Sequence, residues 1–270
     1  MKFGICNEIF DGWKLRDAMQ FAKDIGYHAI EIAPFTLANY VTEISDSDRK
    51  RIRADAAEVG IEIAGIHWVL VKAEGMYLTH PDKEVRKKTA DYFCELVEFC
   101  ADIGGRVIVV GSPKQRSILP GISYEQAWGW AKEVFNDAVQ LAFERGVVIC
   151  LEPLAPSETN FINKAEEAIK FIKEFNIPSF RLILDVKAMS SEQKPIPQII
   201  RESAPYLAHF HANDKNLKGP GFGDVDFYPI ANALKEIGYN GYVSVEVFKF
   251  DEGPEEIARR SIEYLKKVFK

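Results

Sequence analysis

Four apolar segments in the second half of the chain each end in a residue that can bind a metal or move a proton. In chain order these residues are Glu152, Asp185, His211 and Glu246. Successive ones lie about 26 to 35 residues apart, close to the length of one strand–helix unit. Charged and imidazole groups are costly to bury unpaired, so four of them in such segments need a common cause. If the segments are neighbouring strands, roughly 5 Å apart, the four side chains meet at one end of a sheet.

Three carboxylates and one imidazole in one place indicate a divalent metal site. The carboxylates repel one another and a single histidine cannot neutralise them, whereas a divalent cation can. An oxygen-rich ligand set with one nitrogen suits Mn²⁺, Mg²⁺ or Co²⁺ better than a thiolate-preferring metal. We expect one ion, with Mn²⁺ the first candidate. The alternative that the residues leave open is an ion-pair cluster completed by Lys187, Lys215 or Lys249.

The rest of the chain alternates short β-branched segments with longer amphipathic ones, which predicts alternating strands and helices. Strands are predicted at Phe3–Asn7, His28–Ile32, Ile61–His67, Arg106–Val110, Val147–Glu152, Arg181–Asp185, Leu207–His211 and Tyr242–Glu246. Helices are predicted near 14–25, 46–59, 82–103, 123–145, 164–175, 195–204, 226–237 and 254–268. Helix-capping signals support these boundaries, among them the capping-box spacing of Ser123 and Gln126 and a glycine after five of the helices.

Eight such units in 270 residues, with no linker or change of composition between them, predict one domain over residues 1–270. We interpret that domain as a (β/α)8 TIM barrel, an α/β fold. The competing fold is a doubly wound sheet, which usually opens with a glycine-rich turn, and this chain has no G-x-G-x-x-G motif. In a TIM barrel, active sites lie at the carboxyl ends of the strands, where the four residues stand.

Composition narrows the class of protein and its location. Hydrophobic residues make up 47% of the chain, the net charge is −6, and no apolar segment is long enough to span a membrane. Nothing at the N-terminus reads as a signal peptide, so the cytoplasm is the expected compartment. An acidic balance argues against a nucleic-acid partner, because phosphate binding needs a basic face. The four cysteines, Cys6, Cys94, Cys100 and Cys150, are expected to be free thiols.

The strand ends and the loops after them also carry longer motifs. These are Leu151–Leu154 with Glu158 following, Leu184-Asp185, His209–Asp214, Gly221–Phe227 and Gly241–Glu246. At these motifs the chain resembles the xylose isomerase-like TIM barrel superfamily of sugar phosphate isomerases and epimerases. The pattern is most similar to its D-tagatose/D-psicose (ketose) 3-epimerase branch.

The resemblance implies a set of roles. The equivalents of Glu152, Asp185, His211 and Glu246 bind one divalent metal in that family. The equivalents of Glu152 and Glu246 also exchange protons with the substrate, and a residue matching Glu158 contacts the sugar. Two positions depart from the branch: Ala188 stands where a substrate-binding histidine is usual, and the segment Lys215–Lys218 lacks the usual arginine.

General chemistry gives a mechanism that fits these residues. A metal that polarises a carbonyl and its neighbouring hydroxyl stabilises an enediolate. Of two glutamates on opposite faces of a sugar, one can remove the proton from carbon and the other can return it, which inverts that carbon. If the proton returns to the neighbouring carbon, the result is an aldose–ketose isomerase. A dehydratase acting on a related polyol or keto acid would use the same intermediate. We expect Glu152 and Glu246 to transfer the proton.

Three further features are candidates for the pocket. His67, at the end of the third strand, is expected to contact the substrate, with Trp68 as an aromatic wall. Arg116, in the loop after the fourth strand, could reach a carboxylate or phosphate of the substrate. The alternatives are a hydrogen-bonded histidine at the rim and an ordinary solvated loop. The glycine-rich segment Gly219–Gly223 is a weak candidate for phosphate binding.

Two other functional classes are alternatives to the epimerase. Abasic-site endonucleases share the barrel but need several further histidines, and this chain has five histidines in total. A metal-free scaffold would not need the four ligand candidates. We therefore expect a small-molecule sugar or sugar derivative as the partner, no nucleic acid and no membrane. A homo-oligomer is expected because related proteins commonly pair.

Overall fold

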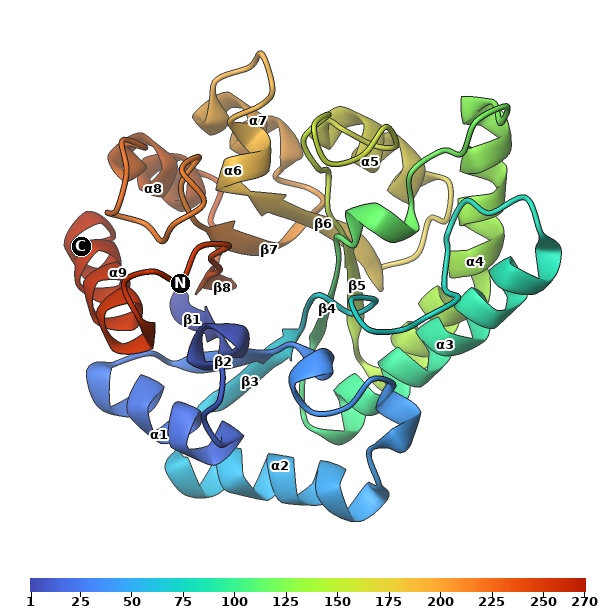
Figure 1. The fold of residues 1–270 in the computed structure, drawn as a ribbon. Coiled ribbons are helices and arrows are strands. Elements are labelled where there is room, and N and C mark those ends of the chain that lie inside the picture. The colour runs from blue at the N-terminus through green and yellow to red at the C-terminus, as the bar shows by residue number, and fades with distance from the viewer.

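The strands form a closed parallel barrel in sequence order. The computed structural model describes all residues from 1 to 270. Its strands are β1 (Lys2–Cys6), β2 (Ala29–Ile32), β3 (Glu62–Ile66), β4 (Val107–Val110), β5 (Val148–Leu151), β6 (Phe180–Asp185), β7 (Leu207–Ala212) and β8 (Tyr242–Val245). Each strand pairs with the next, and β8 closes on β1. The helices surround this ring (Figure 1). The predicted (β/α)8 barrel is confirmed, and every predicted strand end lies within one residue of the observed one.

Helices connect the strands on the outside of the barrel. They are α1 (Leu15–Ile25), α2 (Asp46–Val59), α3 (Lys83–Asp102), α4 (Tyr124–Arg145), α5 (Ala165–Lys173), α6 (Val186–Met189), α7 (Ile196–Ser203), α8 (Phe227–Glu236) and α9 (Pro254–Val268). The predicted capping box at the start of α4 is present, since Ser123 accepts a hydrogen bond from the Gln126 N–H. The sequence did not predict α6 or the 3₁₀ turns η1 (Asn7–Phe10), η2 (Pro34–Thr36), η3 (Val41–Glu43) and η4 (Pro113–Gln115). Segments this short show no hydrophobic period.

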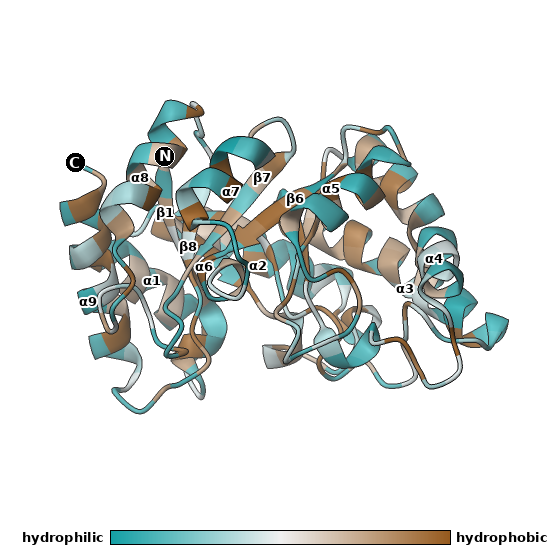
Figure 2. Ribbon diagram, turned by 90° about the horizontal axis from the view of Figure 1, so that it is seen from above, coloured by the Kyte–Doolittle hydropathy of each residue, from teal (hydrophilic) through white to brown (hydrophobic).

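The core fills the space between strands and helices. One cluster of 70 buried hydrophobic residues joins the outward faces of the strands to the inward faces of the helices. Figure 2 shows the brown, hydrophobic residues on the strands and on the helix faces turned toward them. The four cysteines are free thiols, as predicted. Burying this much apolar surface holds the barrel rigid, which fixes the strand ends that carry the site.

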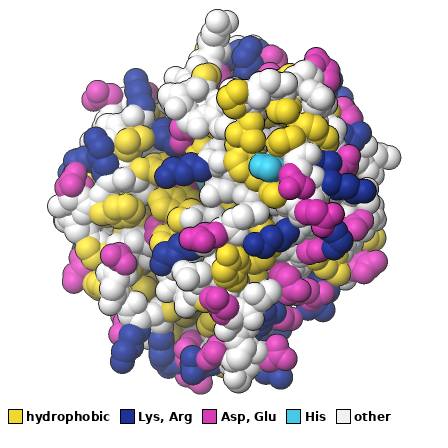
Figure 3. Space-filling view, turned by 45° about the vertical axis from the view of Figure 1, so that its right-hand side comes forward, with side chains coloured by type: hydrophobic (Ala, Val, Ile, Leu, Met, Phe, Trp, Pro, Cys, Tyr) yellow, Lys and Arg dark blue, Asp and Glu magenta, His cyan; other side chains and the backbone are white.

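The molecular surface in Figure 3 carries charged residues of both signs together with hydrophobic side chains. On the face drawn in Figure 3, lysines and arginines are interspersed with aspartates and glutamates. None of the helices combines the length and the apolar character that a membrane crossing requires.

Candidate metal centre

The four predicted ligand residues meet at one end of the barrel. Their ligand atoms all lie within 4.8 Å of one another, and all four residues are buried: Glu152, Asp185, His211 and Glu246. The sheet register explains the meeting. Asp185 and His211 are direct partners across β6 and β7. The Glu246 N–H donates to the Ala212 carbonyl at 3.3 Å and so extends the β7–β8 ladder to the glutamate.

The charges at this point fit a divalent cation. The carboxylate of Glu152 accepts no hydrogen bond, and burial, followed by the charges of Glu246 and Asp185, raises its pKa well above the usual value. Burial and then Glu246 also raise the pKa of Asp185, to about 6. Buried carboxylates that disfavour each other's charge need a cation between them. An ion bound by all of them would satisfy that need.

Two buried atoms of the cluster have no hydrogen-bond partner. Nδ1 of His211 and Oε2 of Glu246 face each other at 3.2 Å, yet neither has an aligned donor or acceptor. Unpaired buried polar atoms are rare in native proteins and call for a missing water or ion. A metal ion would use the lone pairs of both atoms.

Hydrogen bonds to both carboxylate oxygens fix the orientation of Asp185. Its Oδ1 accepts the Ala188 N–H at 2.7 Å, and its Oδ2 accepts an Nδ2–H of Asn213 at 2.5 Å. Asn213 is itself fixed, because its Oδ1 accepts the Lys187 N–H at 2.8 Å. Hydrogen bonds of this kind orient a ligating carboxylate and are part of the site.

Glu31, at the carboxyl end of β2, orients His211 from across the barrel. Oε1 of Glu31 lies 3.0 Å from Nε2 of His211, and Oε2 lies 2.8 Å from Nε2 of His209. Burial favours the neutral acid, but the two histidines outweigh that effect and hold the pKa of Glu31 well below its usual value. An ionised carboxylate only accepts hydrogen bonds, so Nε2 of His211 carries the hydrogen. The other nitrogen, Nδ1, is left for the metal.

Replacing Glu31 by Gln should therefore weaken metal binding. An amide cannot accept from both histidines, so the tautomer and orientation of His211 are no longer fixed. We expect the Mn²⁺ affinity to fall about 10- to 100-fold. Titration with Mn²⁺ followed by electron paramagnetic resonance measures this directly. Glu62→Gln is the matched control, since Glu62 is a strand glutamate bonded to Lys2 at the exposed start of β3. Equal affinities in the two variants would contradict the role of Glu31.

A cavity of about 350 Å³ opens in front of the carboxylates. Glu152 and Glu246 both line it, together with Glu158 and Lys187. Nζ of Lys187 lies 2.8 Å from Oε1 of Glu158 and 3.9 Å from the centre of the Phe248 ring. The remaining lining residues are Trp68, Val71, Val109, Gly111, Ser112, Pro113, Lys114, Gln115 and Leu154. This size suits a small organic molecule.

Comparison with known proteins identifies the family. A family model described as a xylose isomerase-like TIM barrel matches residues 19–268. The chain belongs to this family.

Its relatives in the family include named sugar epimerases. The chain is 29% identical over 226 residues to the D-psicose 3-epimerase of Ruminiclostridium cellulolyticum, covering 83% of this chain and 75% of that one. It is 24% identical over 273 residues to the 3-dehydro-D-guloside 4-epimerase of Escherichia coli, covering 98% and 99%. The solved D-psicose 3-epimerase of Clostridium cellulolyticum with D-tagatose has a TM-score of 0.88 at 24% identity, over 100% of both chains. The IOLI protein with a zinc atom has a TM-score of 0.79 at 19% identity, over 100% of this chain and 98% of that one.

Only one of the three predicted substrate contacts lines the cavity. Glu158 lies there, as expected. His67 is fully buried with its Nε2 2.7 Å from Oε2 of Glu8, and it does not reach the cavity. Arg116 is also buried, and its guanidinium donates to the carbonyls of Glu152 and Ile162 at 2.7 and 3.1 Å. Neither residue lines the cavity where substrate contacts were expected, and Arg116 instead holds the backbone of Glu152.

The predicted site did not include several residues that shape it. Glu31 and Asn213 orient ligands, while Lys187 and Phe248 line the cavity. The sequence held one usable signal. Residues two apart on a strand point to the same side, so His209 shares the barrel interior with His211 and needs a buried partner. Nothing in the spacing identifies that partner as Glu31, which comes from the far side of the barrel.

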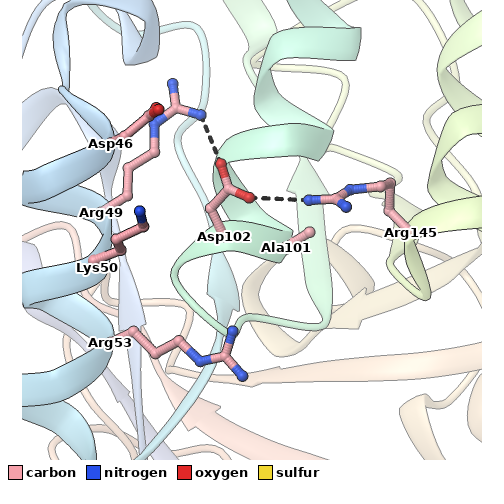
Figure 4. A pocket seen from close by; sticks show the side chains of 7 residues that line it. All are labelled: Asp46, Arg49, Lys50, Arg53, Ala101, Asp102 and Arg145. Atoms are coloured by element: carbon pink, nitrogen blue, oxygen red, sulfur yellow. Dashed lines mark hydrogen bonds and ion pairs between the residues drawn. The ribbon is translucent and has the colours of Figure 1, made fainter.

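A larger hollow, about 410 Å³, lies outside the barrel between α2 and the ends of α3 and α4. Figure 4 shows the Asp102 carboxylate between two arginines, at 3.0 Å from Arg49 and 2.9 Å from Arg145. It contains no converging group of buried carboxylates. These ion pairs tie three helices together, so we assign the hollow to packing and not to chemistry.

Acid should weaken metal binding at the centre. An ion must displace the proton from a carboxyl ligand, and the pKa of Asp185 is raised to about 6 by burial and by Glu246. The acid is mostly ionised at pH 7 and mostly protonated at pH 5, so the Mn²⁺ affinity should fall at least about tenfold between them. The folding stability of the metal-free protein should change with pH in the opposite direction. Because folding raises the pKa of Asp185, stability is lost as the pH rises through 6. A Mn²⁺ affinity that does not change from pH 7 to pH 5 would contradict this.

Proposed function

We propose that this protein is a divalent-metal-dependent sugar epimerase, an isomerase of the ketose 3-epimerase type. The single observation that carries the proposal is the meeting of three buried carboxylates and one histidine, two of whose glutamates, Glu152 and Glu246, line a cavity of about 350 Å³. The curated relatives named as sugar epimerases support the reaction class.

The residues suit one ion, with Mn²⁺ first and Mg²⁺ or Co²⁺ as alternatives. Glu152, Asp185 and Glu246 would bind it through oxygen, and His211 through Nδ1. When bound, such an ion polarises a substrate carbonyl and makes the hydrogen on the neighbouring carbon more acidic.

Glu152 and Glu246 would move the proton. Both carboxylates line the cavity, so each can reach a bound sugar. One takes the hydrogen from the carbon next to the carbonyl, and the other delivers a proton to the opposite face of that carbon. The two glutamates then exchange roles in the reverse direction. The carbon is inverted while the carbonyl stays in place.

Glu158 and Lys187 would bind the hydroxyls of the sugar. Their ion pair lies at the cavity, and carboxylate and ammonium groups are strong partners for hydroxyls. Ala188 uses its N–H on Asp185 and has no polar side chain to offer. The hydroxyl contacts thus come from a different set of residues than in the ketose 3-epimerase pattern, so we infer a substrate that differs from a plain ketohexose in one or more substituents.

Solvent deuterium incorporation tests the proposal. Protein loaded with Mn²⁺ in D₂O is incubated with D-psicose, D-tagatose, D-fructose, ketopentoses, acidic sugars and sugar phosphates, and each is followed by NMR. We expect deuterium at the carbon beside the carbonyl together with the epimer at that carbon. Appearance of an aldose would assign an isomerase, and loss of water would assign a dehydratase. No exchange with any sugar would contradict the proposed function.

A further inference from the structure

Trp68, directly after β3, has an unusual backbone. Its φ is +51°, in the left-handed region. For a bulky side chain this conformation is an outlier, and it persists only where the surroundings fix it. Such residues cluster at functional sites, and Trp68 lines the cavity in front of the metal centre.

Two aromatic rings stack on the Trp68 indole. The Phe35 ring, from the loop after β2, lies 5.8 Å away at an interplanar angle of 18°. The Phe248 ring, from the loop after β8, also lies 5.8 Å from the indole, at an interplanar angle of 25°. The stack spans three loops of the barrel rim. It restricts the orientation of the indole, because tilting the ring would weaken both contacts.

In that orientation the indole N–H reaches a carboxylate of the centre. Nε1 of Trp68 donates to Oε1 of Glu246 at 2.7 Å. No other group donates a hydrogen bond to that oxygen. The second oxygen, Oε2, faces Nδ1 of His211 at 3.2 Å. The carboxylate is thus held at one oxygen by the indole, with the other directed into the cluster.

We propose that Trp68 is the positioning residue of Glu246, and that stacking on Phe35 and Phe248 directs the indole N–H of Trp68 toward that carboxylate. This inference rests on the proposed function for the proton-transfer role of Glu246. An indole is a donor without charge, so it fixes the carboxylate without neutralising it. A lysine or arginine at the same place would compete with the metal for the carboxylate. Lys187, which lines the same cavity, is instead paired with Glu158.

Trp68→Phe tests the proposal because it keeps an aromatic ring in the stack and removes the N–H. We expect the Mn²⁺ affinity, measured by electron paramagnetic resonance, to fall about 10- to 100-fold. At saturating Mn²⁺, kcat should fall by a similar factor while KM stays within about twofold, since the lost interaction acts on the carboxylate and not on the sugar. The matched control is Trp128→Phe. Trp128 also donates its Nε1–H to a glutamate, Glu174, at 3.0 Å, but on the outer helices. The Trp128→Phe variant should leave the Mn²⁺ affinity and kcat unchanged.

Two outcomes would overturn the proposal. One is a Trp68→Phe protein with unchanged Mn²⁺ affinity and kcat but a raised KM, which would make Trp68 a wall for the sugar only. The other is a loss no larger than in Trp128→Phe. The Mn²⁺ measurement needs no substrate, so it judges Trp68 even if no sugar is epimerised and the proposed function fails.

The unaltered protein provides a measurement that does not depend on the variant folding. The chain has four tryptophans, so ¹⁵N-labelled indoles give four N–H signals in an NMR spectrum. Mn²⁺ should broaden one of them most strongly, the one beside the centre. We expect that signal to exchange slowly with D₂O before Mn²⁺ is added. Rapid exchange of the broadened signal would contradict the hydrogen bond to Glu246.

Discussion

Glu152→Gln and Glu246→Gln proteins should each lose epimerisation by about 10²- to 10⁴-fold, the usual contribution of a general acid or base. An amide can neither take the proton from carbon nor return it. The two variants should differ in one respect. The glutamate that remains can still exchange the hydrogen on its own face of the sugar. In D₂O each variant should therefore label one epimer and not the other, and the two variants should label opposite epimers.

Two controls separate this loss from loss of the metal or of the fold. Asp185→Asn removes a metal ligand that takes no part in proton transfer with the sugar. Excess Mn²⁺ should therefore restore turnover in the Asp185→Asn protein but not in the two glutamine variants. Glu174→Gln alters a surface glutamate bonded to Lys132, and it should behave as the unaltered protein. Near-normal turnover in either Glu152→Gln or Glu246→Gln would contradict the roles given to them.

Removing the metal should abolish turnover and lower thermal stability. Without an ion, the carboxylates of Glu152, Asp185 and Glu246 are left buried beside one another, with Glu246 and Asp185 contributing to the raised pKa of Glu152. At Mn²⁺ about 100-fold above its Kd, binding adds about 2.7 kcal/mol to the free energy of unfolding. For a chain of this length, that corresponds to roughly 5 °C in Tm. Activity and calorimetry before chelation, after chelation and after Mn²⁺ is returned measure both effects.

The Asp185→Asn variant, which lacks one metal ligand, is the control for the chelation experiment. In Asp185→Asn the same addition of Mn²⁺ should raise Tm much less, because one ligand and one charge are gone. Chelated protein that is shown to be free of metal and yet keeps full turnover would contradict a metal-dependent mechanism.

The fold could be predicted because each local signal indicates the same architecture. Apolar segments of four to six residues, amphipathic segments of two to six turns and capping residues such as Ser123 repeat eight times in one order. A parallel strand needs a crossover, and the repeated crossover with no break in the chain leads to a barrel. The short helix α6 could not be predicted because Val186–Met189 spans barely one turn.

The meeting of the ligands could be predicted for a related reason. Glu152, Asp185, His211 and Glu246 end strands that are neighbours in the sequence and in the barrel, so strand spacing alone brings them together. Sequence could not supply contacts across the barrel. Glu31 reaches His211 from β2, a strand that is not next to β7.

The directions in which several side chains point could not be predicted from the sequence either. The spacing places Arg116 in a rim loop, but its guanidinium turns inward because carbonyls, including those of Glu152 and Ile162, need donors there. His67 and Trp68 are adjacent in the chain and point to different places. The left-handed backbone at Trp68 turns its indole toward Glu246, while His67 stays with Glu8.

The most direct test of the metal centre is anomalous X-ray scattering from crystals of the protein soaked in Mn²⁺. We predict one strong peak within about 2.0 to 2.3 Å of a carboxylate oxygen from each of Glu152, Asp185 and Glu246 and of Nδ1 of His211. A map with no peak among these four residues, or with the ion bound instead by Glu31 and His209, would contradict the account.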